Sequence, residues 1–181
     1  MAIYNTSSDS ANTMVRAFLT KIGEMYLGHS FNTGSGKGKA IWARIKEETF
    51  NNKCAFRQTS SDNLTIEHLV MFNREQCGLH HPGNVVPCCK SCNKRLRHSD
   101  TKTYFDWEEQ LKAVCQDIND LKKRRQKIRN HIKNEGYPKL TEDELNALRA
   151  VAMSLYERTS SELEKSMDLF MDIDKTLVRR R

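Results

Sequence analysis

Proline and glycine are scarce in this chain of 181 residues, with 3 and 8 copies, which argues against collagen-like and low-complexity classes. No window comes near the roughly 18 consecutive apolar residues of a membrane span. Residues 1–10 are polar and lack the basic and apolar regions of a secretory signal. We therefore expect a cytoplasmic protein, in which thiols stay reduced. Acidic residues are outnumbered as well, 23 against 30 Lys and Arg, and the net charge of +7 favours a polyanionic partner.

The chain does contain six cysteines, and four of them fall between residues 77 and 92. In a reducing compartment, such a cluster indicates metal binding or catalysis before disulfides. A chain of this length buries a core without disulfide staples. Its hydrophobic fraction of 38% is that of a globular protein.

Apolar periodicity divides the chain into a helical start, a turn-rich middle and a charged helical end. We predict helices over 10–28, 40–50 and 91–97, strands over 52–57 and 64–70, and two helices within 104–178. The last region carries a heptad-like apolar seam, a break at 134–138 and a capping box that begins at Thr141. The predicted fold class is α+β and mainly helical, with an antiparallel helical hairpin as its C-terminal extension.

The middle of the chain holds the residues that suggest chemistry. Glu67 and His68 are neighbours on a predicted strand, so they face opposite sides unless a twist, a bulge or the strand end lets them converge. Asn84 follows near a turn, and then comes the knuckle Cys89-x2-Cys92 with Asn93 directly after it. Because a knuckle turns the chain sharply, Asn93 is able to face back toward the strand.

This arrangement resembles the HNH endonuclease family, whose fold is a ββα-metal finger. The resemblance covers about 50–98 and rests on Glu67-His68, Asn84-Val85 and Cys89-Lys-Ser-Cys92-Asn93, in that order. It implies a central nuclease finger in a domain over 1–103, followed by the helical extension over 104–181.

The resemblance also implies a role for each residue of the motif. His68 would be the general base that takes a proton from water. Glu67 and Asn93 would hold one divalent cation, Mg²⁺ or Mn²⁺, through oxygen. Asn84 would hydrogen-bond across the finger and fix the loop that orients His68. The acid departs from the family pattern, in which Asp is commoner than Glu.

Many members of the family also hold a structural zinc between two Cys-x2-Cys knuckles. Cys54, Cys89 and Cys92 match three of the four ligands, but the remaining position is Arg57. A fourth ligand would come from one of four nearby side chains, namely Cys77, His80, His81 or Cys88. The alternative is that no zinc binds and that packing replaces it.

The implied function is a metal-dependent DNA endonuclease that hydrolyses phosphodiester bonds, of the restriction, defence or mobile-element kind. Its partner is double-stranded DNA, and cutting both strands needs two active sites, which favours a homodimer. Five basic residues are predicted to contact DNA phosphates: Arg57, Lys90, Lys94, Arg95 and Arg97. The rival function is a non-catalytic zinc-knuckle DNA-binding module, in which Glu67 and Asn93 are dispensable. A helical scaffold with a decayed finger is a third hypothesis.

Overall fold

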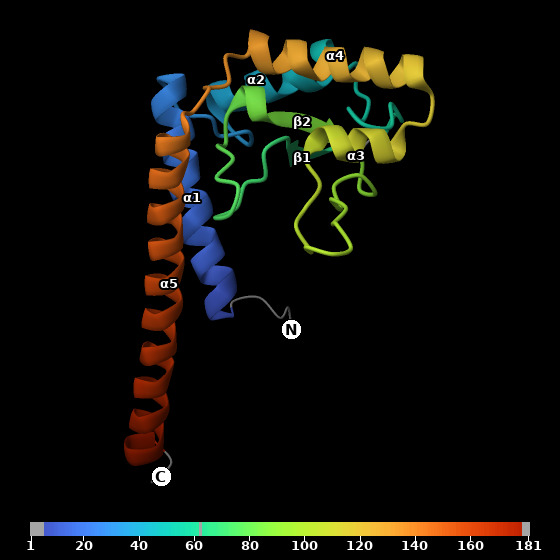
Figure 1. The fold of residues 1–181 in the computed structure, drawn as a ribbon. Helices are drawn as coiled ribbons and strands as arrows, with labels where there is room; N and C mark the ends of the chain where they lie inside the picture. Colours follow the sequence, from blue (N-terminus) through green and yellow to red (C-terminus); the bar gives the residue numbers. More distant parts are fainter. Residues whose placement is uncertain (1–5, 62, 179–181) are drawn as a thin grey trace. The chain divides into compact units, whose positions relative to one another are not determined.

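The computed structural model describes residues 6–61 and 63–178 and shows a mainly helical α+β protein (Figure 1). Five α-helices and one two-stranded sheet lie within these residues, in the order α1 (Ser7–Leu27), α2 (Gly36–Arg44), β1 (Thr65–His68), β2 (Val85–Cys88), α3 (Trp107–Val114), α4 (Ile118–Asn134) and α5 (Glu142–Ile173). Shorter helical turns are η1 (Ile45–Thr49), η2 (Pro82–Asn84) and η3 (Asp174–Val178). Within the described ranges, no helix combines the length and the apolarity needed to cross a bilayer.

The chain divides into two compact units. We call the described parts of 20–72 and 78–139 the sheet unit, and those of 1–19, 73–77 and 140–181 the α5 unit. The sheet unit contains the hairpin and every residue of the HNH-like motif. Each unit is described by itself below.

The core of the sheet unit forms around the antiparallel pair of β1 and β2, with Thr65 opposite Cys88 and His68 opposite Val85. All four residues of β2 are buried, as expected for a strand rich in valine. The largest apolar side chains in this core come from loops, helices and the end of β1, and they include Phe31, Ile45, Phe50, Phe56, Leu69, Leu111 and Ile128. From α4, Nε2 of His131 lies 3.0 Å from the carbonyl oxygen of Val85, so the helix is anchored where β2 begins.

Helix ends follow the local sequence closely. Gly28 ends α1 in the left-handed region at φ 77°, which glycine adopts without steric cost. Thr141 and Glu144 form the predicted capping box at the start of α5. Asp106 caps α3 in the same way. The predicted helix over 10–28 is thus confirmed as α1, which begins three residues earlier, at Ser7.

Three predictions of secondary structure were wrong. Residues 52–57 form turns with one isolated bridge, Lys53 to Ser60, because the amide of Gln58 closes a tight turn onto the carbonyl of Cys54. The helical seam expected from residue 104 to 121 is interrupted, because Asp117 accepts from the amide of Asp120 and begins a new helix, α4.

The predicted short helix over 91–97 is absent as well. The chain turns at the knuckle and then forms an isolated bridge between Arg97 and Tyr104. Arg95 lies between these two features, and its guanidinium is bonded to β1 rather than exposed on a helix. The helix that follows the hairpin is therefore α3, which begins at Trp107.

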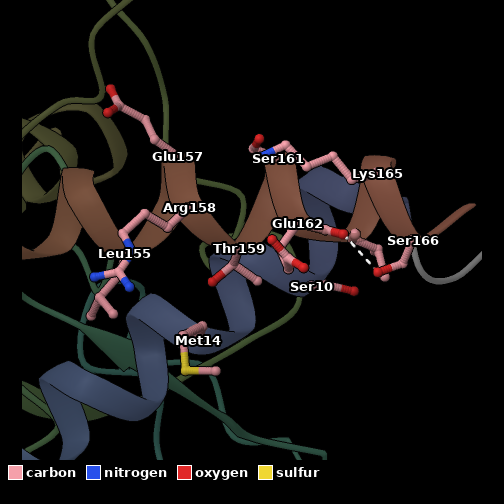
Figure 2. Close-up of a pocket in the computed structure, with 11 residues that line it drawn as sticks. Ser10, Met14, Leu155, Glu157, Arg158, Thr159, Ser161, Glu162, Lys165 and Ser166 are labelled. Atoms are coloured by element: carbon pink, nitrogen blue, oxygen red, sulfur yellow. Dashed lines mark hydrogen bonds between the residues drawn. The ribbon is translucent and has the colours of Figure 1, made fainter. Parts of the chain in front are cut away.

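In the α5 unit, the long helix packs along α1 (Figure 1). Ser8 and Tyr156 join through their hydroxyl oxygens at 3.0 Å, and the Arg74 guanidinium stacks over the Tyr156 ring at 4.0 Å. A groove of about 880 Å³ lies between the two helices, with Met14 and Leu155 on its walls (Figure 2). Farther along α5, large apolar side chains such as Met167 and Phe170 are exposed, whereas Ala152 is buried. No residue of the HNH-like motif lines this groove.

Candidate functional site

His68 is the last residue of β1, and its ring contacts the rings of His80 and Phe72. Nε2 of His68 lies 3.0 Å from Nδ1 of His80, and the Phe72 ring stacks on the His68 ring with centroids 4.6 Å apart. The pKa of His68 is lowered to about 3, mainly by burial and to a smaller extent by the neighbouring His80 and Arg95. The imidazole of His68 is therefore neutral near pH 7, the state in which it can accept a proton.

Glu67 is buried and paired with Arg95. Nε and Nη2 of Arg95 donate to Oε1 of Glu67 at 2.9 and 2.5 Å. The same guanidinium also donates to three backbone carbonyls, those of His68, Leu69 and Phe105. Burial raises the pKa of Glu67, and the neighbouring guanidinium opposes that rise. The prediction that Arg95 contacts DNA was wrong, because its side chain is only 1% exposed.

Asn84 makes hydrogen bonds across the loop that joins the two strands. Its Nδ2 donates to the carbonyl oxygens of Val70 at 3.0 Å and Leu79 at 2.8 Å, and its Oδ1 accepts from the amide of Val70 at 2.7 Å. Its own carbonyl oxygen accepts from the amide of Leu69. With every side-chain donor and acceptor engaged in a buried position, Asn84 fixes the backbone directly after His68.

Asn93 is exposed and contacts the other end of β1. Its Nδ2 donates to Oγ1 of Thr65 at 2.8 Å. Its backbone N–H donates to the carbonyl oxygen of Cys89 and so closes the turn of the knuckle. Thr65 and Glu67 share one face of the strand, because they are two residues apart and the pairing with β2 has no bulge. The structure thus brings Asn93 and Glu67 to the same face of β1, whereas His68 points to the opposite face, where His80 and Phe72 hold it.

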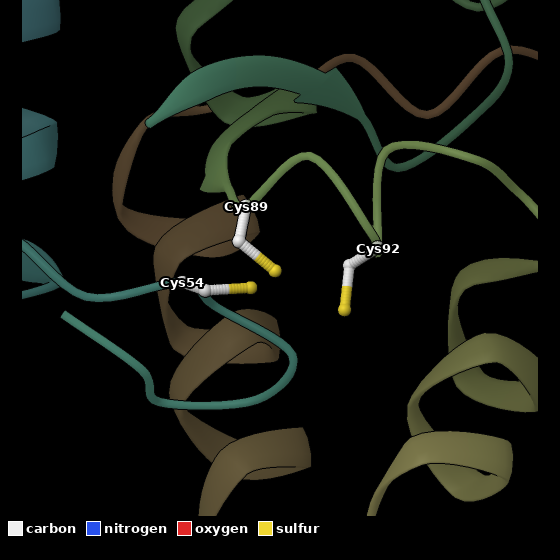
Figure 3. Close-up of side chains that lie close together, drawn as sticks. All are labelled: Cys54, Cys89 and Cys92. Carbon is white, nitrogen blue, oxygen red and sulfur yellow. The ribbon is translucent and has the colours of Figure 1, made fainter. Parts of the chain in front are cut away.

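The thiols of Cys54, Cys89 and Cys92 come together beneath the hairpin, and Figure 3 shows their sulfur atoms converging. These sulfur atoms all lie within 4.8 Å of one another. The amide of Arg57 donates to Sγ of Cys54 at 3.5 Å, so the first turn keeps a knuckle-like bond although its second cysteine is replaced. Hydrogen bonds from Cys88 and Cys92 lower the pKa of Cys54, which favours a thiolate.

This group could hold a metal ion such as zinc, since tetrahedral zinc at about 2.3 Å from sulfur needs thiolates roughly 4 Å apart. Among the four candidates for the fourth ligand, Cys88 lies outside this group of three, its thiol donates to the carbonyl of Cys89, and Cys54 and Cys92 raise its pKa, which disfavours a thiolate. His80 is engaged with His68, and Nδ1 of His81 accepts from the amide of Gly83. Cys77 belongs to the α5 unit, where its thiol donates to the carbonyl of Arg74.

A scan against protein-family models, a search of curated proteins and a search of solved structures found no match to this chain. The resemblance to HNH nucleases therefore rests on the motif residues of the sequence.

Four of the five basic residues predicted to contact DNA are exposed: Arg57, Lys90, Lys94 and Arg97. Arg97 lies over the Tyr104 ring at 4.0 Å and donates to its hydroxyl. Arginines of the basic run on α4 are engaged with acids, since Arg125 and Arg129 both pair with Glu108. The exposed cations nearest to the motif in the chain are thus those flanking the knuckle.

Sequence reasoning missed two partners of the motif. It considered His80 and His81 as candidates for the fourth zinc ligand, but His81 is buried in the sheet unit and His80 bonds directly to His68. It also treated Arg95 as one of several surface cations. A histidine a dozen residues from the base and a single arginine in a basic stretch carry no local signal, because these contacts depend on how the loops fold back.

We expect purified protein to carry about one zinc ion per chain, because three sulfur atoms converge at the separation that tetrahedral zinc requires. Replacing Cys92 by serine should remove most of the zinc, measured by elemental analysis after gel filtration. The matched control is Cys115→Ser, which changes a buried thiol outside the group and should leave the zinc content unchanged. Zinc-free wild-type protein prepared with zinc in the growth medium would contradict this expectation.

Proposed function

We propose that the protein is a metal-dependent DNA endonuclease of the HNH type, in which β1, β2, the knuckle and α3 form the ββα-metal finger. The observation that carries the proposal is the buried hydrogen-bond network of Asn84, which joins the backbone after His68 to the loop before β2. A neutral histidine at the end of β1, with a carboxylate and a carboxamide on the opposite face of that strand, supplies the residue types that this function uses.

His68 is the proposed general base. Its ring is neutral at physiological pH, and a neutral imidazole can take a proton from the water that attacks a phosphodiester. The stacked Phe72 ring and the bond to His80 restrict its orientation. When DNA binds, nearby phosphates would raise the pKa of His68 and make it a stronger base.

Glu67 and Asn93 are the proposed ligands of one divalent cation. Arg95 donates to Oε1 of Glu67, and Oε2 accepts none of these bonds. Asn93 uses its nitrogen toward Thr65, which leaves its carbonyl oxygen for a ligand. Two hard oxygens of this kind suit Mg²⁺ or Mn²⁺, and the bound cation would neutralise charge on the phosphate. Because Arg95 already neutralises Glu67, we expect DNA phosphates to contribute to cation affinity.

The exposed basic side chains around the knuckle, Arg57, Lys90, Lys94 and Arg97, are the proposed contacts to the DNA backbone. Each phosphate they neutralise adds to the salt dependence of binding. One site cuts one strand, so cleavage of duplex DNA is expected from two copies of the chain acting together. A restriction, defence or mobile-element role fits such an enzyme.

The experiment that tests the proposal is nicking of supercoiled plasmid with Mg²⁺ or Mn²⁺, with and without EDTA. We expect metal-dependent conversion to open-circular and linear DNA, and a loss of about 10²–10⁴-fold in rate for His68→Ala, the usual contribution of a general base. DNA binding by His68→Ala, measured by gel shift, should be kept because His68 makes no proposed phosphate contact.

The control variant is His98→Ala, a partly exposed imidazole beside Phe105 that lies outside the motif. It should cut like the wild type. DNA binding without cutting under every metal condition would overturn the nuclease and favour the zinc-knuckle binding module. Absence of both DNA cutting and salt-dependent DNA binding would overturn both functions and favour the third hypothesis, a helical scaffold with a decayed finger.

A further inference from the structure

Helix α4 runs along the outside of the sheet unit and borders two hollows there (Figure 1). The first hollow, of about 510 Å³, is lined by α4 together with Arg44 and Thr49. The second, of about 330 Å³, is lined by α4 together with Gln58. Lys123 and Lys127 line both hollows. Because these lysines are four residues apart, they lie on one side of the helix, and we call the surface that holds both hollows the α4 face.

The acidic side chains of the α4 face are already paired, and they do not neutralise the two lysines. In the first hollow, the carboxylate of Glu135 accepts from Nη1 and Nη2 of Arg44, each at 2.8 Å. In the second, Oδ2 of Asp120 accepts from Nη2 of Arg124 at 3.1 Å. Neither lysine forms an ion pair with any residue that the structure describes. The α4 face therefore carries two positive charges in excess.

One of these charges is held in place by an aromatic ring. Nζ of Lys127 lies 5.3 Å from the centre of the Phe50 ring, a distance at which the face of a ring attracts a cation. Gln126 and Asn130 add carboxamides beside it, joined by a bond of 2.8 Å from Nε2 to Oδ1. Ammonium groups with neighbouring polar donors are a typical set for phosphate oxygens. Because like charges four residues apart destabilise a helix, a bound anion would also stabilise α4.

The length of the α4 face favours a polymer over a small anion. From residue 120 to residue 135, a helix extends about 22 Å. Each strand of duplex DNA carries a phosphate about every 3.4 Å along the axis, so several phosphates span this length. Gln58, on the wall of the second hollow, follows Arg57, an exposed residue already proposed to contact DNA. The α4 face thus continues the surface proposed for the DNA backbone.

We propose that the α4 face is a second binding surface for the phosphate backbone of duplex DNA, with Lys123 and Lys127 as its contact residues. This inference rests on the DNA binding of the proposed function, but it does not depend on cutting. Phosphate contacts set the position of a protein on DNA without reading the sequence. The α4 face would therefore bind duplexes of any sequence.

The first test measures how binding of a short fluorescent duplex by the full-length protein depends on NaCl concentration, without added divalent cation. Lys123→Gln and Lys127→Gln should each reduce the slope of log Kd against log salt by about 0.9, the value for one phosphate contact. At about 0.1 M salt, each should weaken binding by roughly 8-fold, whatever the sequence of the duplex. Lys127→Arg keeps the charge and should bind like the wild type.

The matched control is Lys122→Gln. Lys122 is exposed on the same turn of α4 and lines neither hollow, so its loss should change the slope much less. Equal slopes for the Lys122, Lys123 and Lys127 variants, or a wild type that does not bind duplex DNA, would overturn the proposal. Variants that weaken binding of an RNA duplex alone would also overturn it, in favour of RNA. A wild type that binds without cutting ends the nuclease function, whereas the slopes still decide the role of the α4 face.

The second test uses the wild-type protein and so does not depend on how the variants fold. Lysine side chains are acetylated with and without duplex DNA, and mass spectrometry locates the modified residues. We expect DNA to protect Lys123 and Lys127 more strongly than Lys122. Equal modification of Lys123 and Lys127 in the presence and absence of bound DNA would contradict the proposal.

Discussion

Replacing Arg95 by methionine is expected to lower the free energy of unfolding by about 3–5 kcal/mol, the usual cost of breaking a buried ion pair. The substitution leaves Glu67 without its counter-ion and removes the donors to the carbonyls of His68 and Leu69. For a chain of this size, such a loss corresponds to a fall in Tm of roughly 6–20 °C. Thermal denaturation followed by circular dichroism measures the change.

Lys94→Met is the matched control, because it removes an exposed cation next to Arg95 and should change Tm by little. The double variant Arg95→Met with Glu67→Leu should recover part of the loss, since no buried charge remains. A Tm for Arg95→Met equal to that of Lys94→Met would show that the buried pair does not form.

The loss of unfolding free energy caused by Arg95→Met also depends on pH. Burial raises the pKa of Glu67 and the guanidinium lowers it, so the pKa rises further when Arg95 is removed. A carboxyl whose folded pKa lies above its unfolded value stabilises the fold at low pH and loses that contribution as pH rises through the folded pKa. We therefore expect the unfolding free energy of Arg95→Met to fall further below that of the wild type near pH 7.5 than near pH 5.

Replacing Asn84 by alanine is expected to cost about 3 kcal/mol or more, because it leaves one buried and two half-buried backbone groups without these partners, at about 1–3 kcal/mol each. These groups are the amide and carbonyl of Val70 and the carbonyl of Leu79. Because the same bonds fix the chain after His68, nicking should fall together with stability. Chemical denaturation gives the free energy, and the plasmid assay below the melting range gives the rate.

Two further variants sharpen the test of Asn84. Asn84→Asp keeps the acceptor for Val70 but loses both donors and places a charge beside two carbonyls, so it should be destabilised as much as Asn84→Ala. Asn134→Ala, at the exposed end of α4, is the control and should stay within about 0.5 kcal/mol of wild type. A stable Asn84→Asp would mean that the loop does not depend on these donors.

Arg95 and Asn84 support the same short piece of chain from two directions. Arg95 bonds to the carbonyls of His68 and Leu69, and Asn84 bonds to both backbone groups of Val70. The backbone from the last residue of β1 onward is thus held by buried polar contacts rather than by a longer strand. This explains how His68 keeps a defined position although β1 ends there.

Local signals in the sequence were enough for much of the fold. The capping box at Thr141 and the glycine at the end of α1 were both predicted from neighbouring residues, and both are confirmed. The strand predicted over 64–70 is present as β1, since β-branched residues mark it. The resemblance to the HNH family grouped Cys54 with Cys89 and Cys92, and the structure brings their sulfur atoms together.

The sequence by itself thus determined the helical ends, the strand β1 and the set of polar and sulfur residues available for a site, because each depends on short-range propensity or on a compact motif. It did not predict β2, the partner of β1. Only the tertiary structure decided that Arg95 is buried on Glu67 and that His80 bonds to His68. These pairs are 28 and 12 residues apart, and their contacts follow from how two loops fold back onto β1. A side chain's burial and its partner are set by that packing, which no local pattern of residues encodes.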